Sequence, residues 1–318
     1  MGLYSIKGDK LKTIELKSFK KEREIQNLIE KNTETLFDID FVSSEFKIGE
    51  FRIDTLCFDN ETNSFVIIEY KKGSSYSVID QGYSYLSKML NNKDSFILEY
   101  CRKKKVSVDI DIDWSQSKII FISPSFNSYQ KNSVNFKDMN KFELWEIKRF
   151  ENDTIVLNQH QSNSEESIEK VVGNNDGVIN KVNKEIKVYN VEEHTSKLSS
   201  QLYERWIEFK DLIFDLGGVE LIPKRHYVSL KFEGKSFCVC IFRKESIVVE
   251  IRRGNINTDG TKSKNFFHID DPKKISKQSQ WTWRNGTKGG LYKIIFDNKL
   301  DLNYLIFLVK QKYDSLNS

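Results

Sequence analysis

The sequence predicts an α/β (α+β) protein with a mixed β-sheet flanked by helices, followed by a second, smaller α+β domain. Three observations lead to this fold class. Between residues 20 and 150, short β-branched and aromatic runs alternate with amphipathic helical patterns. A polar, turn-rich segment follows over 159–189. Over 190–318, a new series of alternating strands lies between two helical patterns with apolar faces.

Composition sets the class of protein. The 318 residues suffice for two domains of ordinary size, and 30% charged with 13% aromatic residues is typical of a soluble globular chain. Residues 190–318 contain 22 basic and 16 acidic residues, so the net charge of +4 comes from this part. The sequence contains no apolar run of membrane-spanning length and no signal-peptide core, so we expect a cytoplasmic protein without a membrane partner.

The cysteines and histidines argue against a zinc enzyme or a disulfide framework. The four cysteines form no CxxC pair, and the four histidines are scattered along the chain. Cys57 and Cys101 lie among apolar residues, so we expect them to be reduced core side chains.

The first predicted domain spans 1–158. Residues 1–18 are rich in lysine and alternate weakly, as in an edge strand or an arm. The spacing of Ile25, Leu28 and Ile29 predicts a helix over 20–32. Further helices are expected from about Ser77 and over 125–134, and further strands over 41–48, 118–123 and 142–150. The pattern over 94–105 fits a strand or a helix, and we favour the helix.

Residues 51–71 form the central motif, a predicted β-hairpin with its turn at 59–63. Asp54 lies on the first strand, and Glu69 and Lys71 lie on the second. A four-residue loop would place Asp54 directly opposite Glu69, with Cβ atoms roughly 5 Å apart. Two carboxylates in a half-buried sheet repel each other, and a divalent cation with oxygen ligands would compensate for this.

This spacing of Asp54 and Glu69-x-Lys71 resembles the core of the PD-(D/E)XK nuclease superfamily, particularly its RecB-like branch with the restriction-endonuclease-like fold. The run Gly49-Glu50-Phe51-Arg52-Ile53-Asp54 matches the Gly-x-x-x-Ile-Asp approach of that branch. Gln81 matches a glutamine on the following helix. The sequence departs from the name of the superfamily at Ile53, where the name has proline. The resemblance covers roughly residues 20–150.

The resemblance implies an endonuclease that hydrolyses phosphodiester bonds with Mg²⁺ or Mn²⁺, acting on nucleic acid, most often DNA. Asp54, Glu69 and the backbone carbonyl of Tyr70 would hold the metal. Lys71 would orient water or stabilise the transition state, and Gln81 would position water or backbone. Glu24 on the first helix would reach the metal site, with Glu30 as the alternate. Glu24 and Gln81 equally fit a solvent-facing role. Family analogy also suggests restriction, defence or repair, and cutting of both strands would suggest a homodimer.

The second predicted domain spans 190–318, after the 159–189 linker. An apolar face over 198–216 predicts a helix that ends at Gly217-Gly218, and the domain closes with a helix over 302–313. Strands are expected over 227–232, 237–243, 247–252 and 291–296. The domain resembles one found behind some nuclease modules, and this resemblance supplies no role for it.

Mixed basic and aromatic residues indicate weak nucleic-acid candidates. In the second domain these are Lys274, Trp281, Trp283, Arg284 and Lys288. In the first domain they are Arg102 and Lys103, within a basic run that ends at Lys105. The alternative is that the tryptophans fill the core and the basic residues are ordinary solvated surface.

Two other functions stay open from the sequence. One is a catalytically inactive nucleic-acid-binding or sensor protein on a nuclease fold. The other is a regulatory protein whose second domain binds a partner while the first serves as a scaffold.

Overall fold

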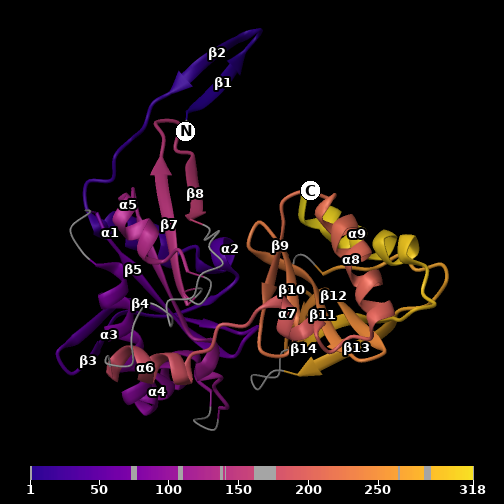
Figure 1. The fold of residues 1–318 in the computed structure, drawn as a ribbon. Helices are drawn as coiled ribbons and strands as arrows, with labels where there is room; N and C mark the ends of the chain where they lie inside the picture. Colours follow the sequence, from indigo (N-terminus) through magenta and orange to yellow (C-terminus); the bar gives the residue numbers. More distant parts are fainter. Residues whose placement is uncertain are drawn as a thin grey trace. The chain divides into compact units, whose positions relative to one another are not determined.

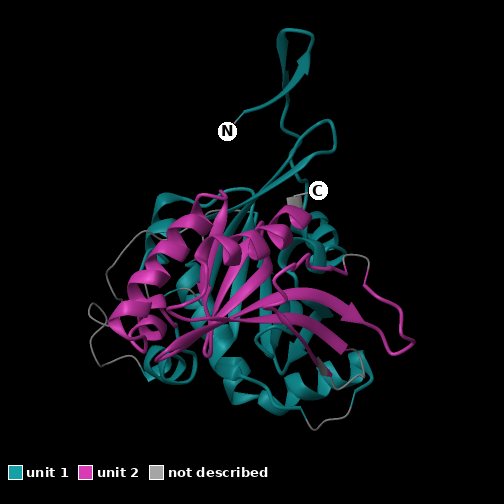
Figure 2. Ribbon diagram, turned by 90° about the vertical axis from the view of Figure 1, so that its right-hand side faces the viewer, with its two compact units in different colours: residues 1–188 teal, residues 189–318 magenta. Residues whose placement is uncertain are grey.

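The computed structural model describes residues 2–72, 77–106, 110–136, 139, 141–160, 177–263, 266–282 and 288–317. The chain divides into unit 1, Met1–Val188, and unit 2, Tyr189–Ser318 (Figure 2). Unit 1 contains a mixed sheet flanked by helices, and unit 2 contains a separate antiparallel sheet with its own helices. The predicted fold class is therefore confirmed.

The sheet of unit 1 has six strands in the order β3-β4-β5-β6-β7-β8. Strands β3, β4 and β5 form an antiparallel meander, β5, β6 and β7 run parallel, and β8 returns antiparallel to β7. The central strands are buried because both faces are covered. The six strands are β3 (Asp40–Ile48), β4 (Phe51–Asp59), β5 (Ser64–Tyr70), β6 (Lys118–Ser123), β7 (Phe142–Arg149) and β8 (Ile155–His160).

Two hydrophobic clusters lie on the two faces of this sheet. Helices α1 (Glu22–Glu30) and α2 (Thr33–Phe37) pack on one face, where Ile25 and Ile29 contact alternate residues of β5. Helices α3 (Val78–Asn91), α4 (Lys93–Lys104) and α6 (Gly177–Glu185) pack on the other, with α5 (Ser128–Ser133) beside α3. The short 3₁₀ helix η1 (Trp114–Gln116) precedes β6.

Helix α3 approaches the sheet closely at Gly82. A Cβ atom at this position would lie 2.5 Å from Cε1 of the buried Phe142 on β7. Only glycine fits such an approach without displacing the ring. The side chain of Ser77 accepts a hydrogen bond from the backbone N–H of Asp80 and caps the helix where the sequence predicted its start.

The N-terminal segment forms a hairpin of β1 (Leu3–Lys7) and β2 (Lys10–Ile14), which extends beyond the sheet in Figure 1. A bridge between Leu16 and Phe150 connects it to the end of β7. The prediction left an edge strand and an arm open for residues 1–18, and the hairpin matches the arm.

The predicted 159–189 linker includes structure that belongs to unit 1. Strand β8 continues to His160, and helix α6 packs on α3 through the buried Val182. Ile186, directly after the helix, is buried as well. Residues 161–176 of the segment lie outside the described residues.

Unit 2 is built on a six-stranded antiparallel sheet in the order β13-β14-β12-β11-β10-β9. Its core lies between this sheet and the helices α8 (Ser200–Phe214) and α9 (Leu302–Asn317), with Trp206 and Phe209 among its largest buried side chains. The strands are β9 (Val219–Pro223), β10 (Val228–Phe232), β11 (Lys235–Arg243), β12 (Ser246–Ile256), β13 (Lys277–Thr282) and β14 (Lys288–Phe296).

The strands and helices predicted for the second domain are all present, and three short elements add to them. These are α7 (Val191–Thr195), β9 and β13. Cys57, Cys101, Cys238 and Cys240 are buried and unbridged, which confirms that Cys57 and Cys101 are reduced core residues.

Candidate active site

The β4–β5 hairpin has the predicted register. Asp59 pairs with Ser64, so residues 60–63 form a four-residue loop, and the ladder extends to the pair Thr55 and Ile68. Asp59 Oδ1 accepts hydrogen bonds from two backbone N–H groups within this loop. Asp54 and Glu69 are the next residues beyond the last pair, on opposite strands and at the same level.

Asp54 is held by the backbone of β5. The N–H of Tyr70 donates a hydrogen bond to Asp54 Oδ2 at 3.1 Å, at the point where the ladder between β4 and β5 ends. The next backbone group, the N–H of Lys71, donates instead to Ile122 O of β6 at 2.9 Å. The Asp54 carboxylate therefore takes the position that a backbone acceptor of β4 would occupy.

Glu69 gathers the other predicted residues. Lys71 Nζ lies 2.8 Å from Glu69 Oε1, and Gln81 Nε2 donates to the same oxygen at 3.1 Å. Glu69 is only 3% exposed, because α3 covers this face of β5. Asp54, Glu69, Lys71 and Gln81 thus converge at the carboxyl end of β5 and the first turns of α3.

The electrostatics of the pair follow from burial. Desolvation raises the pKa of Glu69 to about 7, with the neighbouring Asp54 carboxylate adding to the rise and Lys71 opposing it. Desolvation likewise raises the pKa of Asp54, and the Tyr70 N–H and Lys71 oppose this rise. Ionising both acids this close together is costly, and a divalent cation would offset this cost further than Lys71 does.

Two buried acceptor atoms at this place have no hydrogen-bond partner among the described residues: Glu69 Oε2 and Gln81 Oε1. Buried oxygen atoms normally have a hydrogen-bond partner, so two buried acceptors without one indicate a ligand site. Carboxylate and amide oxygens are the donors that Mg²⁺ and Mn²⁺ prefer. In the described residues, no three His, Cys, Asp or Glu side chains group as a metal site, so an ion here would rely on the two acids and backbone or water oxygens. The residues present fit a hydrated Mg²⁺ or Mn²⁺ ion.

Tyr85 also belongs to the site, although it lies outside the sequence motif. Its hydroxyl accepts from Gln81 Nε2 at 3.4 Å and donates to Arg52 O at 3.3 Å. The hydroxyl is also close enough to Glu69 to affect the pKa of that acid. Its position one helical turn after Gln81 is the sequence signal that could have revealed it.

Helix α1 carries the predicted candidate Glu24 and its alternate Glu30. Glu24 Oε2 accepts the N–H of Lys20 at 3.2 Å and lies 3.6 Å from Arg149 of β7, so no contact links its carboxylate to Glu69 or Asp54. The backbone N–H of Lys72, just after Lys71, donates instead to Glu22 Oε1 at 2.7 Å. The role of Glu24 stays a prediction.

Gln26 and Glu30 connect α1 to the backbone of the site. Gln26 is buried, and its Nε2 donates to Asp54 O at 2.9 Å and to Glu30 Oε1 at 2.9 Å. The Thr55 hydroxyl donates to the same oxygen of Glu30 at 2.7 Å and lies 3.1 Å from the Tyr70 hydroxyl. This network lies on the α1 face of the sheet, whereas the Glu69 side chain lies on the α3 face.

The basic candidates of the first domain are engaged in ion pairs. Arg102 Nη2 lies 2.7 Å from Glu99 Oε2, and Lys103 Nζ lies 4.0 Å from Glu99 Oε1. Lys104, in the same run, pairs with Asp40 at 2.9 Å. These contacts fit the solvated helix end that the sequence left as the alternative for this run.

The candidates of the second domain lie around the β13–β14 edge of its sheet. Lys288 is exposed on β14 opposite Thr282, and Lys274 is exposed just before β13. The backbone of Trp281 lies on β13. Trp283 and Arg284 lie outside the described residues.

Comparison with known proteins identifies a relative along nearly the whole chain. No protein-family model matches the sequence. A protein of Haemophilus influenzae (strain ATCC 51907 / DSM 11121 / KW20 / Rd), described as "Uncharacterized protein", is 38% identical over 316 residues, which cover 98% of this chain and 99% of that protein. The chain belongs to the same family as this protein.

Three solved structures show partial similarity. The EndoMS–dsDNA2 complex matches 42% of this chain and 47% of its own, at a TM-score of 0.28 and 20% identity. A repair endonuclease from Pyrococcus abyssi matches 41% of this chain and 48% of its own, at a TM-score of 0.24 and 19% identity. SfsA of Pyrococcus furiosus in complex with Ca²⁺ matches 49% of this chain and 74% of its own, at a TM-score of 0.25 and 14% identity. The matches thus span about half the length of the two endonuclease chains.

None of the helices in the described residues combines the length and apolar character needed to cross a membrane.

Proposed function

We propose that the chain is a divalent-metal-dependent endonuclease that hydrolyses phosphodiester bonds in DNA. One observation carries this proposal. Glu69 Oε2 is a buried acceptor without a partner among the described residues, and it belongs to an acid that lies opposite Asp54 and 2.8 Å from Lys71. A purely structural ion pair between Glu69 and Lys71 would not need a second buried acid beside it.

Asp54, Glu69 and the backbone carbonyl of Tyr70 would hold a Mg²⁺ or Mn²⁺ ion. When bound, such an ion supplies Lewis acidity to a phosphoryl group and lowers the pKa of a nearby water. The Tyr70 N–H fixes Asp54 Oδ2, and Gln81 Nε2 fixes Glu69 Oε1, so neither carboxylate has to be reoriented before the reaction. Gln81 Oε1 is available to accept a hydrogen bond from water.

Lys71 has the position of a group that stabilises negative charge. Its ammonium lies beside Glu69 at the end of β5 and is mostly buried, with 15% of its side chain exposed. A cation in such a water-poor place stabilises charge on a phosphoryl group more than an exposed one does. Glu24 would take part only after giving up its contacts with Lys20 and Arg149.

The experiment that tests the proposal is a cleavage assay. Labelled single- and double-stranded DNA and RNA are incubated with the protein in Mg²⁺, Mn²⁺ or EDTA. The wild type is expected to cut DNA only with a divalent ion. Asp54→Asn and Glu69→Gln are expected to abolish cleavage, whereas Glu50→Gln, in the exposed turn before β4, should cut like the wild type.

Cleavage by Asp54→Asn or Glu69→Gln at the wild-type rate would overturn the assignment of the site. DNA binding without cleavage in any metal would instead support the alternative of an inactive nucleic-acid-binding protein. RNA cleavage without DNA cleavage would support metal-dependent phosphodiester hydrolysis and would show that the substrate is RNA instead of DNA.

A further inference from the structure

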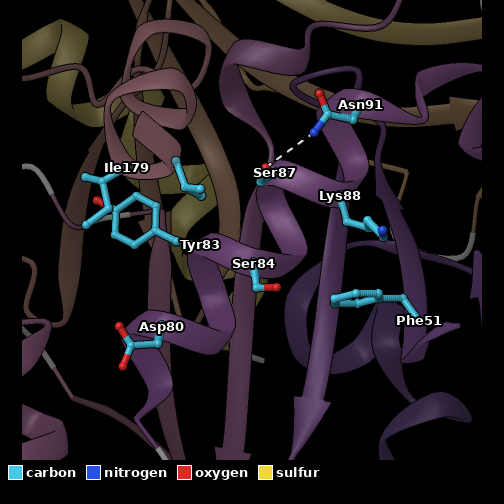
Figure 3. Close-up of a pocket in the computed structure, with 9 residues that line it drawn as sticks. Phe51, Asp80, Tyr83, Ser84, Ser87, Lys88, Asn91 and Ile179 are labelled. Carbon is cyan, nitrogen blue, oxygen red and sulfur yellow. Dashed lines mark hydrogen bonds between the residues drawn. The ribbon is translucent and has the colours of Figure 1, made fainter. Parts of the chain in front are cut away.

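A groove lies between α3 and α6, with Phe51 of β4 at its margin (Figure 3). Its volume is about 450 Å³, within the range of about 300–1,000 Å³ that is usual for small-ligand sites. One wall is polar and comes from α3, and the other is apolar and comes from the first turn of α6. The lining residues used below are Phe51, Asp80, Ser84, Ser87, Lys88 and Val178.

Contacts connect this groove to the catalytic residues through Tyr85. Its hydroxyl accepts from Gln81, which itself donates to Glu69. On the other side, the ring of Tyr85 meets that of Phe51 edge to face, with centroids 6.1 Å apart. Phe51 therefore lines the groove and lies three residues before Asp54 on the same strand.

The chemistry of the groove differs along its length. At one end, Lys88 Nζ lies over the ring of Phe51, 4.6 Å from its centroid, and no carboxylate of the described residues is found in an ion pair with it. An ammonium over an aromatic ring still has N–H donors that point away from the ring and can bind an anion. At the other end, the Asp80 carboxylate repels anions and accepts hydrogen bonds.

The two walls between these ends suit a base and a sugar. Ser84 and Ser87 present hydroxyl groups from α3, and Figure 3 shows Ser87 accepting a hydrogen bond from Asn91. Val178, from the first turn of α6, also lines the groove and is 47% exposed. An aromatic base packs on such an apolar wall while its edge hydrogen-bonds to the polar one.

We propose that this groove binds one nucleotide of the DNA strand that the active site cuts, with its phosphate at Lys88 and its base between Val178 and the serines of α3. This inference rests on the proposed function for the identity of the ligand. The groove would then fix the strand relative to Asp54 and Glu69, and the Asp80 end would set its direction.

The test measures binding rather than cleavage. The anisotropy of a fluorescein-labelled single-stranded DNA 16-mer and of its duplex is recorded in EDTA, so that no strand is cut. The variants are Lys88→Ala, which removes the cation, and Ser87→Trp, which fills the groove without changing charge. Lys184→Ala is the matched control, since Lys184 is an exposed cation of α6 outside the groove.

Lys88→Ala is expected to weaken binding about fivefold and to make the slope of log affinity against log salt shallower by about one. Ser87→Trp should weaken binding about tenfold, the loss of one packed base. Lys184→Ala should bind like the wild type. One abasic substitution, moved along the 16-mer, should weaken wild-type binding at a single position, and Ser87→Trp should abolish this dependence on position.

Wild-type affinity in both Lys88→Ala and Ser87→Trp would overturn the proposal, as would an equal loss in Lys184→Ala or no DNA binding by the wild type. The two proposals fail separately. If the protein binds DNA through this groove and never cuts it, the groove proposal stands and the nuclease proposal is wrong. If the protein cuts DNA while both variants bind DNA normally, the nuclease proposal stands and the groove proposal is wrong.

Discussion

The backbone N–H of Tyr70 donates a hydrogen bond to Asp54 Oδ2 at 3.1 Å, so the strand that carries one acid of the site fixes the other. Lys71 follows directly after this strand and lies 2.8 Å from Glu69. The consecutive residues Glu69, Tyr70 and Lys71, at the end of β5, thus organise the candidate site. Because a backbone group makes the contact to Asp54, it depends on the register of the hairpin rather than on a side-chain rotamer.

Removing the lysine should separate catalysis from folding. Lys71→Ala is expected to lower the cleavage rate by about 10²–10³-fold, the usual loss when a group that stabilises transition-state charge is deleted. The fold should persist, because Glu69 can take up a proton when its partner is gone. The cleavage rate and the thermal unfolding midpoint at pH 6 are the two measurements. A large loss of stability at pH 6 with little loss of rate would contradict the assigned role.

The stability of the metal-free protein should fall as the pH rises from about 4.5 to 7. The pKa of Glu69 is about 7 in the folded state and 4.5 ordinarily. Within this window the unfolded chain therefore binds fewer protons, and stability is lost as pH increases. The shift corresponds to about 3 kcal/mol at most. Urea denaturation in EDTA at pH 5, 6, 7 and 8 measures it, and Glu69→Gln, which cannot titrate, should flatten the curve. If the stability of Glu69→Gln depended on pH as that of the wild type does, the raised pKa of Glu69 would not be the cause.

Gln81 is expected to act through Glu69. Gln81→Ala should reduce Mg²⁺ affinity or cleavage by about 10–100-fold, the usual effect of removing a residue that orients a metal ligand. Tyr85→Phe, which removes only the hydroxyl that accepts from Gln81, should cause a smaller loss in the same direction. Steady-state cleavage at several Mg²⁺ concentrations checks both variants. A loss that excess Mg²⁺ does not reduce in either variant would argue that Gln81 does not act on metal binding.

Gly82→Ala should destabilise unit 1 by about 1–3 kcal/mol, because the new methyl group would lie 2.5 Å from Cε1 of Phe142. Gly177→Ala is the matched control. It lies in a helix as well, and its Cβ would meet nothing within 4 Å. Chemical denaturation followed by circular dichroism gives both values. Equal stability of the two variants would show that α3 does not approach the sheet as closely as described.

The hairpin was predictable because its signals are local. The turn chemistry at Asp59 and the loop of four residues fix the register, and the register alone brings Asp54 level with Glu69. Period-two alternation then places Glu69 and Lys71 on one side of β5. The same holds for the start of α3, where Ser77 caps the helix.

What escaped prediction depends on contacts between distant residues. Glu24 has the right helical position, and only the fold shows that Arg149, 125 positions later, pairs with it. Helix α6 is short and lies in a polar part of the sequence. It is stabilised by the packing of Val182, and of Ile186 directly after it, into the core cluster that includes α3. The short polar strands β8 and β13 gain their pairing from neighbours that sequence patterns do not reveal.

The most direct test of the central claim is a titration of the protein with Mn²⁺, followed by the electron paramagnetic resonance signal of the free ion. The account predicts one site per chain in the wild type and in Glu50→Gln, and loss of that site in Asp54→Asn and in Glu69→Gln. Undiminished Mn²⁺ binding by both Asp54→Asn and Glu69→Gln, or no binding by the wild type, would contradict it.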